Sequence, residues 1–283
     1  MIEGLITKLT GGLYTVKTLD DSIELKARGL FRHEGVSPMV GDHVIIEDGM
    51  ISQVLERRNE LRRPPISNID QVLLVFSGVE PEFSFRLLDR LLAHTTDAGM
   101  TSVIIVTKTD LMSESALASL QAQLTYYETF APVYYTSTET PNQSILDLFP
   151  NKISILAGQS GVGKSTLINV LTGSTIETQA ISQALGRGKH TTRHSELLPL
   201  LGGYVGDTPG FGTLDFMDWT KDQLRDSFAD FVELSQHCKF RGCYHINEPS
   251  CAVKEANVLA SRHESYLLFQ QEVDDLKRYL RKI

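Results

Sequence analysis

The sequence predicts an α/β fold in which a small β-barrel precedes the main sheet and a helical module follows it. Apolar and polar residues alternate in short stretches through residues 1–60, which is typical of antiparallel strands in a barrel. From residue 67 onward, fully apolar stretches alternate with amphipathic ones, the pattern of a parallel sheet covered by helices. Beyond residue 222 the pattern is helical and is interrupted by a cysteine cluster. We therefore expect three units, residues 1–66, 67–222 and 223–283.

Composition excludes several classes of protein. Of the 283 residues, 41% are hydrophobic and 22% are charged, as in a globular and not a disordered protein. No apolar run reaches the roughly 18–20 residues of a membrane helix, and the N-terminus has no secretory signal. We therefore expect a cytoplasmic protein with no membrane partner. A net charge of −8 argues against coating of nucleic acid by bulk attraction.

The barrel is predicted from alternating stretches at residues 22–28 and 42–47, with turns at Gly11-Gly12 and Asp48-Gly49. The stretch 57–65 ends in Arg-Arg-Pro-Pro, and because consecutive prolines interrupt helices and strand ladders, we interpret it as a linker. Two basic clusters leave two alternatives open, contact with RNA or ordinary solvated charge. These clusters are Arg57, Arg58, Arg62 and Arg63, and Lys277, Arg278, Arg281 and Lys282.

The central sheet is predicted from four apolar stretches, at residues 71–77, 103–107, 133–137 and 153–157. Helices are expected near residues 85–98 and 113–124, where the pattern is amphipathic. The last strand leads directly into a glycine-rich turn and a further helix at residues 166–171. A charged helix is expected at residues 261–281 near the end of the chain.

The glycine-rich turn matches the phosphate-binding pattern G-x-x-x-x-G-K-[ST] at residues 158–165. Glycines allow the backbone N–H groups to wrap a phosphate chain, and the helix N-terminus adds a favourable dipole. Lys164 is expected to reach the terminal phosphates, and Ser165 to bind Mg²⁺. A chance glycine-rich turn is the alternative, and the strand before the turn and the helix after it argue against that alternative.

Two later segments are candidates for sensing the third phosphate. Asp207-Thr-Pro-Gly210 has the D-x-x-G spacing at which a carboxylate reaches Mg²⁺ through water and a glycine amide meets the γ-phosphate. Thr191 and Thr192 end a polar stretch, where a threonine can close on the metal when the third phosphate is present. An unstructured surface loop is the alternative for this stretch. The residues expected to hold Mg²⁺ are Ser165, Thr191, Thr192 and Asp207.

A base-reading candidate precedes the phosphate loop. Thr107-Lys108-Thr109-Asp110 follows a predicted strand and resembles the guanine-reading N-K-x-D motif of GTPases. Asp110 would accept hydrogen bonds from the purine N1–H and exocyclic amine, a pattern that adenine lacks, and the Lys108 stem would lie along the base. Thr107 stands where the motif has Asn. For this segment taken alone, a chance Lys-x-Asp at the end of a strand remains an open alternative.

The order of these segments is rotated relative to an ordinary GTPase. The base-reading candidate at residues 107–110 comes before the phosphate loop at 158–165, which normally comes first. Because ligands bind at the carboxyl ends of parallel strands, a permuted connection leaves such a site intact. The segment after Gly210 leads directly into the C-terminal module, so we expect the nucleotide state to move that module.

All three cysteines lie in the pattern Cys238-x4-Cys243-x-His245-x5-Cys251. Three thiolates and one imidazole form the donor set of a closed tetrahedral zinc site, and disulfides are not expected in the cytosol. His237 is a less suitable ligand because it is adjacent to Cys238. Three unrelated buried thiols are the alternative. Because we expect few large apolar residues in this module, one structural Zn²⁺ should supply most of its order.

A barrel, a permuted GTPase unit and a Cys₃His module resemble the circularly permuted, small-subunit-dependent GTPase family of ribosome biogenesis over essentially the whole chain. The resemblance implies an N-terminal OB-fold, a central GTPase and a C-terminal zinc-binding domain that act late in maturation of the 30S subunit and contact its 16S rRNA. The residues assigned to GTP are Thr107, Lys108, Asp110, Gly158, Gln159, Ser160, Gly161, Val162, Gly163, Lys164, Ser165, Thr166, Asp207 and Gly210.

The residue after Gly210 is Phe211, where many GTPases carry a glutamine that orients the attacking water. A phenyl ring cannot orient water, so a partner or another side chain must do so. His190 looks like the family's candidate, and a solvated loop histidine is the alternative. The expected catalytic residues are His190, Lys164 and Thr192, and we predict slow hydrolysis that the small subunit accelerates.

Together these features predict a monomeric, Mg²⁺-dependent enzyme that hydrolyses GTP to GDP and phosphate and serves as a switch on the immature 30S subunit. Assembly factors are further candidate partners. Two other functions stay open, a P-loop kinase or ATPase with an accidental Lys108/Asp110 match, and an RNA-binding scaffold with a vestigial nucleotide site. Asp110→Asn distinguishes a GTPase from the kinase or ATPase, because only in a GTPase should it change the preferred nucleotide from GTP to XTP. Normal maturation of the small subunit with Lys164→Ala would favour the scaffold.

Overall fold

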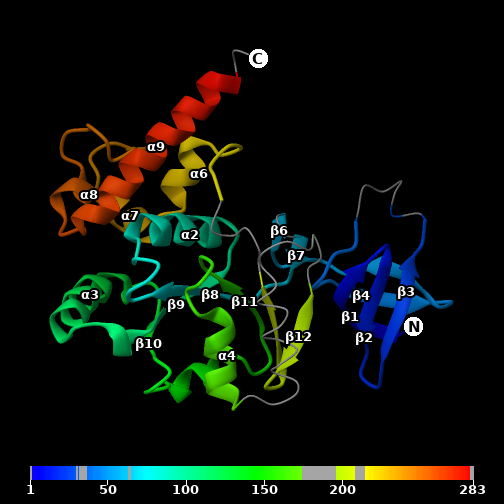
Figure 1. Ribbon diagram of the computed structural model, residues 1–283. Helices are drawn as coiled ribbons and strands as arrows, with labels where there is room; N and C mark the ends of the chain where they lie inside the picture. Colours follow the sequence, from blue (N-terminus) through cyan, green and yellow to red (C-terminus); the bar gives the residue numbers. More distant parts are fainter. Residues whose placement is uncertain are drawn as a thin grey trace.

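The computed structural model describes residues 2–29, 31, 37–62, 65–173, 196–207 and 214–280 (Figure 1). Its N-terminal part is a closed barrel with the strand order β1-β2-β3-β5-β4. The strands are β1 (Ile2–Thr10), β2 (Leu13–Lys17), β3 (Ser22–Ala27), β4 (His43–Glu47) and β5 (Met50–Val54). Ile6, Val16 and Val44 fill the interior and are fully buried, as expected for alternating strands with one apolar face. The predicted barrel is therefore confirmed.

The stretch interpreted as a linker is a hairpin instead. Two short antiparallel strands, β6 (Glu60–Arg62) and β7 (Pro65–Ser67), pair with Arg62 opposite Pro65. Pro65 is the first residue of its strand, a position where the missing N–H interrupts no ladder. Ile66 is fully buried and forms a parallel bridge with Val40 of the barrel region. The linker interpretation of residues 57–65 was therefore wrong.

A buried carboxylate joins the barrel to this hairpin. Asp42 is fully buried and accepts hydrogen bonds from Arg57 Nε at 2.7 Å and from Ser67 Oγ at 2.5 Å. Arg58 pairs with Asp70 at 2.8 Å, just before the central sheet. These two arginines of the first basic cluster therefore hold the protein together, which favours an intramolecular role over contact with RNA. The remaining side chains of both clusters lie outside the described residues.

The central sheet has six strands in the order β10-β9-β8-β11-β13-β12. They are β8 (Gln71–Ser77), β9 (Thr101–Thr107), β10 (Val133–Tyr135), β11 (Ile153–Ala157), β12 (Leu197–Leu200) and β13 (Gly203–Asp207). All neighbours are parallel except the β12–β13 pair, which is antiparallel. The four strands predicted from apolar runs are present, and β12 and β13 form a hairpin that sequence patterning missed.

Helices cover both faces of this sheet. Because side chains alternate along a strand, Val72 and Leu74 of β8 pack on one face with α2 and α3, whereas Leu73 and Val75 pack on the other with α4. All four of these residues are fully buried, so the strand had to be apolar throughout. The covering elements are α2 (Phe85–Asp97), α3 (Glu114–Tyr127), α4 (Lys164–Thr172) and a 3₁₀ turn, η2 (Gln143–Leu148).

The C-terminal helices lie on α2 (Figure 1). They are α6 (Lys221–Asp226), α7 (Ala229–Ser235), α8 (Ala252–Glu255) and α9 (Ala260–Leu280). Arg262 of α9 is buried and pairs with Asp89 of α2 at 2.8 Å and with Asp230 of α7 at 2.6 Å. A buried network of this kind fixes how α9 packs against α2 and α7. Within the described residues, no helix is both long and apolar enough to cross a bilayer.

A dense aromatic cluster fills this C-terminal part, contrary to the expectation of few large apolar residues. Its rings pack edge to face or at tilted angles. The ring centroids lie 4.9 Å apart in the Phe216–Trp219 pair and 5.0 Å apart in the Phe228–Tyr266 pair. The cluster comprises Phe216, Trp219, Phe228, Phe231, Tyr266 and Phe269, all at most 9% exposed. The premise of few large apolar residues was therefore wrong, and these helices have an apolar core of their own.

His94 of α2 lies within this aromatic interface. Its ring stacks on Phe216 with an interplanar angle of 3° and meets the edge of Trp219 at 4.7 Å. Burial, and to a smaller extent the neighbouring Arg90 guanidinium, lower the pKa of His94 to about 4, against the weaker opposing effects of Asp215 and Glu272. His94 is therefore neutral at pH 7 in the folded protein.

Acidification is expected to destabilise the fold through His94. Its pKa is about 4 when folded and about 6.5 when unfolded, so the unfolded chain binds the extra proton between these values. Stability from this group is complete above pH 6.5 and is lost as pH falls toward 4, by about 1–2 kcal/mol at pH 5. Urea unfolding followed by fluorescence of Trp219, the only tryptophan, measures this loss. His94→Phe should remove it, and an identical pH dependence in this variant would contradict the assignment.

Candidate nucleotide site and metal centre

The phosphate loop lies at the carboxyl end of β11 and depends on its glycines. Gly163 has φ of +96°, and a Cβ on Gly158 would lie 2.2 Å from the Val75 carbonyl oxygen. Gly163 is also the N-cap of α4 and carries no side chain that could cap the helix. The amide groups of the first turn therefore face the loop, the arrangement in which helix N-termini bind phosphate.

Lys164 lies folded over the phosphate loop. Its ammonium group donates hydrogen bonds to the carbonyl oxygens of Gly158 at 2.8 Å and Gln159 at 3.2 Å. This places a positive charge directly above the backbone that is predicted to wrap the phosphates. A phosphate chain in the loop would lie within reach of that charge.

The base-reading candidate contacts the phosphate loop directly. The Thr107 hydroxyl donates a hydrogen bond to the Val162 carbonyl at 2.5 Å, and Lys108 Nζ donates one to the Gly161 carbonyl at 2.8 Å. Lys108 adopts a left-handed conformation, with φ of +57°, which turns the chain into a 3₁₀ turn, η1 (Thr109–Leu111). Two segments 55 residues apart in sequence therefore form one continuous structure.

A cavity of about 240 Å³ lies between these two segments. Lys108 and Asp110 line it from the base-reading side, and Gly163 and Thr166 line it from the start of α4. Thr138, after β10, also lines the cavity, and its hydroxyl lies 3.5 Å from the Asp110 carboxylate. The structure thus brings the base-reading and phosphate-binding candidates to one cavity. Sequence reasoning missed Thr138, although its place after a strand of the same sheet was the available signal.

The D-x-x-G candidate begins beside the phosphate loop. Asp207 is the last residue of β13, and its backbone pairs in register with Leu156 of β11, the strand that enters the loop. The Asp207 side chain, Gly210, His190, Thr191 and Thr192 lie outside the described residues. Hydroxyl and carboxylate oxygens are the ligands that Mg²⁺ prefers, so the predicted donor set suits that ion chemically.

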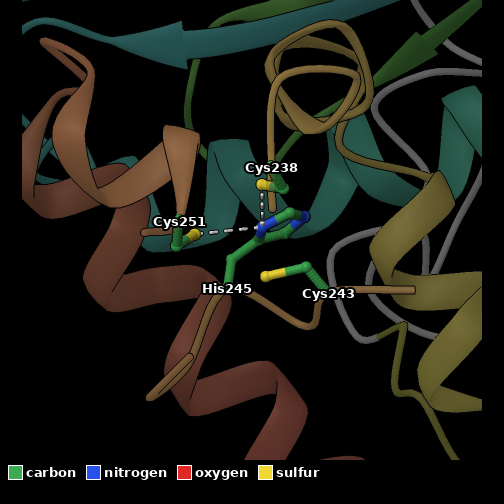
Figure 2. Close-up of side chains that lie close together, drawn as sticks. All are labelled: Cys238, Cys243, His245 and Cys251. Carbon is green, nitrogen blue, oxygen red and sulfur yellow. Dashed lines mark hydrogen bonds between the residues drawn. The ribbon is translucent and has the colours of Figure 1, made fainter. Parts of the chain in front are cut away.

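The cysteine pattern forms a compact cluster in the structure. Figure 2 shows the side chains of Cys238, Cys243, His245 and Cys251 converging, and their ligand atoms all lie within 4.8 Å of one another. His245 faces the thiols with Nδ1, which lies 3.4 Å from Cys251 Sγ and 3.8 Å from Cys238 Sγ. Tetrahedral zinc, with Zn–S bonds of about 2.3 Å, places its sulfur ligands about 3.8 Å apart. These four residues are therefore compatible with a zinc ion, and His237 is not one of them.

The loop that carries the cluster is held by backbone hydrogen bonds. The Glu248 carboxylate accepts hydrogen bonds from the amides of Tyr244 and Ile246 at 2.8 and 2.9 Å. Burial by itself raises the pKa of Glu248, but these backbone hydrogen bonds outweigh it and lower the pKa. Burial raises the pKa of the Cys243 thiol to about 12, so a cation is needed to hold this group as a thiolate.

Comparison with known families agrees with this arrangement. A family model described as "RsgA GTPase" matches residues 54–217, and one described as "RsgA N-terminal domain" matches residues 3–51. The chain belongs to the RsgA GTPase family. "Small ribosomal subunit biogenesis GTPase RsgA" of Shouchella clausii (strain KSM-K16) is 46% identical, and the alignment covers 98% of this chain and 99% of that relative. The protein of the same name from Latilactobacillus sakei subsp. sakei (strain 23K) is 41% identical, with 100% and 99% covered.

Two solved structures share this architecture. The crystal structure of YloQ, titled a circularly permuted GTPase, has a TM-score of 0.82 and 36% identity over 97% of this chain and 96% of that one. The crystal structure of YjeQ from Thermotoga maritima has a TM-score of 0.84 and 32% identity over 96% and 98%. The fold class predicted from the sequence, a permuted GTPase domain with flanking barrel and helical modules, is confirmed.

Proposed function

We propose that this protein hydrolyses GTP to GDP and phosphate and acts as a switch in biogenesis of the small ribosomal subunit. The observation that carries the proposal is the shared cavity, since Asp110 and Gly163 line it together. A nucleotide whose phosphates lie in the loop at Gly163 would then present its base to Asp110. Membership of the RsgA GTPase family and the names of the full-length relatives support the same activity.

Each candidate residue has a distinct task in this proposal. Asp110 accepts hydrogen bonds from the guanine N1–H and exocyclic amine, and the Lys108 stem lies along the base. The backbone of the phosphate loop wraps the phosphates, and Lys164 neutralises charge that develops on the transferred phosphoryl group. Water attacks the γ-phosphorus, the bond to the β-phosphate oxygen breaks, and His190 and Thr192 are proposed to position the water and the phosphate.

Two metal ions belong to the proposal. Ser165, Thr191, Thr192 and Asp207 would hold Mg²⁺, which supplies positive charge next to the phosphates. Cys238, Cys243, His245 and Cys251 would hold one structural Zn²⁺, and their mutual distances within 4.8 Å support this.

The proposed partners are the 30S subunit, its 16S rRNA and assembly factors. We propose that the protein acts in the cytoplasm as a monomer with three units, residues 1–66, 67–222 and 223–283. The loop between two zinc-ligand candidates supports contact with RNA. Phe240 there is 44% exposed, and Lys239 Nζ lies 5.6 Å from its ring. Lys239 and Arg241 are exposed and form no ion pair with any residue that the structure describes. An exposed ring flanked by cations suits an unpaired base and its phosphates.

Hydrolysis of GTP and ATP, measured with and without purified small subunits, tests the proposal. We expect slow GTP hydrolysis by the protein alone, acceleration of at least about tenfold by the subunits, and no comparable hydrolysis of ATP, because a partner must complete the catalytic site. Lys164→Ala is the control and should abolish the acceleration. Equal rates with and without subunits, or a preference for ATP, would contradict the proposal.

A further inference from the structure

The Thr107 side chain lies between the central sheet and the phosphate loop. It ends β9 and is 6% exposed. Its hydroxyl oxygen lies 2.5 Å from the Val162 carbonyl oxygen and 3.1 Å from the Phe76 carbonyl oxygen. Both carbonyls are acceptors only, and a hydroxyl has one hydrogen to give. The single hydrogen of Thr107 is therefore committed within the protein.

Because its hydrogen is donated within the protein, the Thr107 hydroxyl cannot also donate to a bound base. Guanine presents acceptors at N7 and O6 and donors at N1 and the exocyclic amine. An Asn, the common residue at this position of the N-K-x-D motif, carries two amide hydrogens and can hold the loop with one and donate the other. Thr107 has only one hydroxyl hydrogen, and the protein carbonyls of Val162 at 2.5 Å and Phe76 at 3.1 Å compete for it. No hydrogen is left on this side chain for N7 or O6 of a purine.

The neighbouring residues define what Thr107 does instead. Val162 is 1% exposed and directly precedes Gly163, the N-cap of the helix that meets the phosphates. A Cβ placed on Gly163 would lie closest to Thr107, at 3.7 Å from its hydroxyl oxygen. The hydrogen bond to the Val162 carbonyl therefore holds the residue directly before Gly163, and with it the end of the phosphate loop that leads into the helix.

We infer that Thr107 is a positioning residue that braces the phosphate loop at Val162 and leaves N7 of the bound purine without a side-chain hydrogen bond. Guanine is then selected at the opposite edge of the base, which Asp110 reads. This inference rests on the proposed function, because it specifies how the same site recognises GTP. It separates two tasks, since Thr107 sets affinity through the loop and Asp110 sets base identity.

The first test compares GTP with 7-deaza-GTP, in which carbon replaces N7. We expect the wild-type protein to bind the two nucleotides with dissociation constants less than about threefold apart, measured by calorimetry with Mg²⁺ present. A hydrogen bond to N7 would contribute about fivefold to affinity. A loss of about threefold or more with 7-deaza-GTP would therefore overturn the inference.

The second test removes the hydroxyl. Thr107→Val keeps the shape of the side chain and leaves the buried Val162 carbonyl without its donor, so both nucleotides should bind about tenfold more weakly and by the same factor. Thr107→Ser restores the donor and should bind both within about threefold of wild type. Thr101→Val, at the exposed start of the same strand, is the matched control and should bind as wild type does.

The readouts separate this inference from simpler explanations. A merely structural role would lower the melting temperature of Thr107→Val and leave the affinity of the folded protein unchanged, which would overturn the bracing role. If Thr107→Val does not fold, Thr107→Ser and the 7-deaza comparison in wild type still decide the matter. Failure of wild-type protein to bind GTP would refute the proposed function, whereas tight GTP binding with loss of 7-deaza-GTP would refute only this inference.

Discussion

Replacing Asp110 by Asn is expected to change the preferred nucleotide from GTP to XTP. The carboxylate offers two acceptor oxygens to the N1–H and the exocyclic amine of guanine. An Asn offers one acceptor and one NH₂ donor, which matches the N1–H and the C2 carbonyl of xanthine and leaves the guanine amine facing another donor. Because hydrogen bonds to a charged group contribute about 1.5–3 kcal/mol each, GTP affinity should fall by about 10²–10³-fold.

Competition between GTP, XTP and ATP for a fluorescent nucleotide measures this change. Asp20→Asn is the matched control, because the same chemical change is made in an exposed turn of the barrel, outside the cavity. It should leave GTP preference unaltered. Retention of a GTP preference by Asp110→Asn would remove the base-reading role and favour the kinase or ATPase alternative.

Parts of the fold were predictable because local physics left little choice. The strands β8 and β11 were placed at their observed bounds, since every residue of each is buried and the sequence shows an uninterrupted non-charged run between turn residues. The β12–β13 hairpin was missed because Pro199 lies inside its first strand and Leu201, with φ of +50°, precedes Gly202 in the turn. Such residues resemble a loop when patterning alone is considered.

The site was predictable to the level of its motifs and no further. Spacing indicates that Asp110 and Lys164 follow strands of one sheet, and the carboxyl ends of those strands meet at one edge. Spacing does not indicate that the Thr107 hydroxyl meets a carbonyl 55 residues away, because that contact depends on how the loops pack. Similarly, Arg57 belongs to a basic run in the sequence, and only the structure reveals its buried partner Asp42.

The aromatic cluster of the C-terminal part was overlooked for a related reason. Phe216, Trp219 and Phe228 come from short segments with no sustained helical period, and Phe269 comes from a distant helix. Their convergence is a tertiary property. This aromatic core changes the expected effect of losing zinc, because the helices can stay packed on it without the metal.

Loss of the metal is expected to disorder the loop from Cys238 to Cys251 and leave α9 docked. Without a cation the thiols reprotonate, and residues 238–251, all of which the structure describes, contain no helix or strand, so few backbone hydrogen bonds slow exchange there. By contrast, α9 is held to α2 by the Arg262–Asp89 pair at 2.8 Å and by the Arg90–Glu272 pair at 2.6 Å. Amide hydrogen exchange in residues 238–251 should accelerate by about 100-fold, while residues 262–273 stay within about threefold of the metal-loaded protein.

Cys243→Ala and treatment with a zinc-selective chelator should give the same exchange pattern and the same loss of bound zinc. His237→Ala is the matched control, because His237 is adjacent to Cys238 and outside the cluster, and it should retain the metal. Binding to small subunits should weaken by at least about tenfold in Cys243→Ala, since the exposed loop that carries Phe240 loses its shape, whereas GTP affinity should change less than about twofold. Faster amide exchange in α9 as well as in the loop would show that the metal stabilises the whole module. Unchanged exchange in residues 238–251 would mean that the thiols bind no metal.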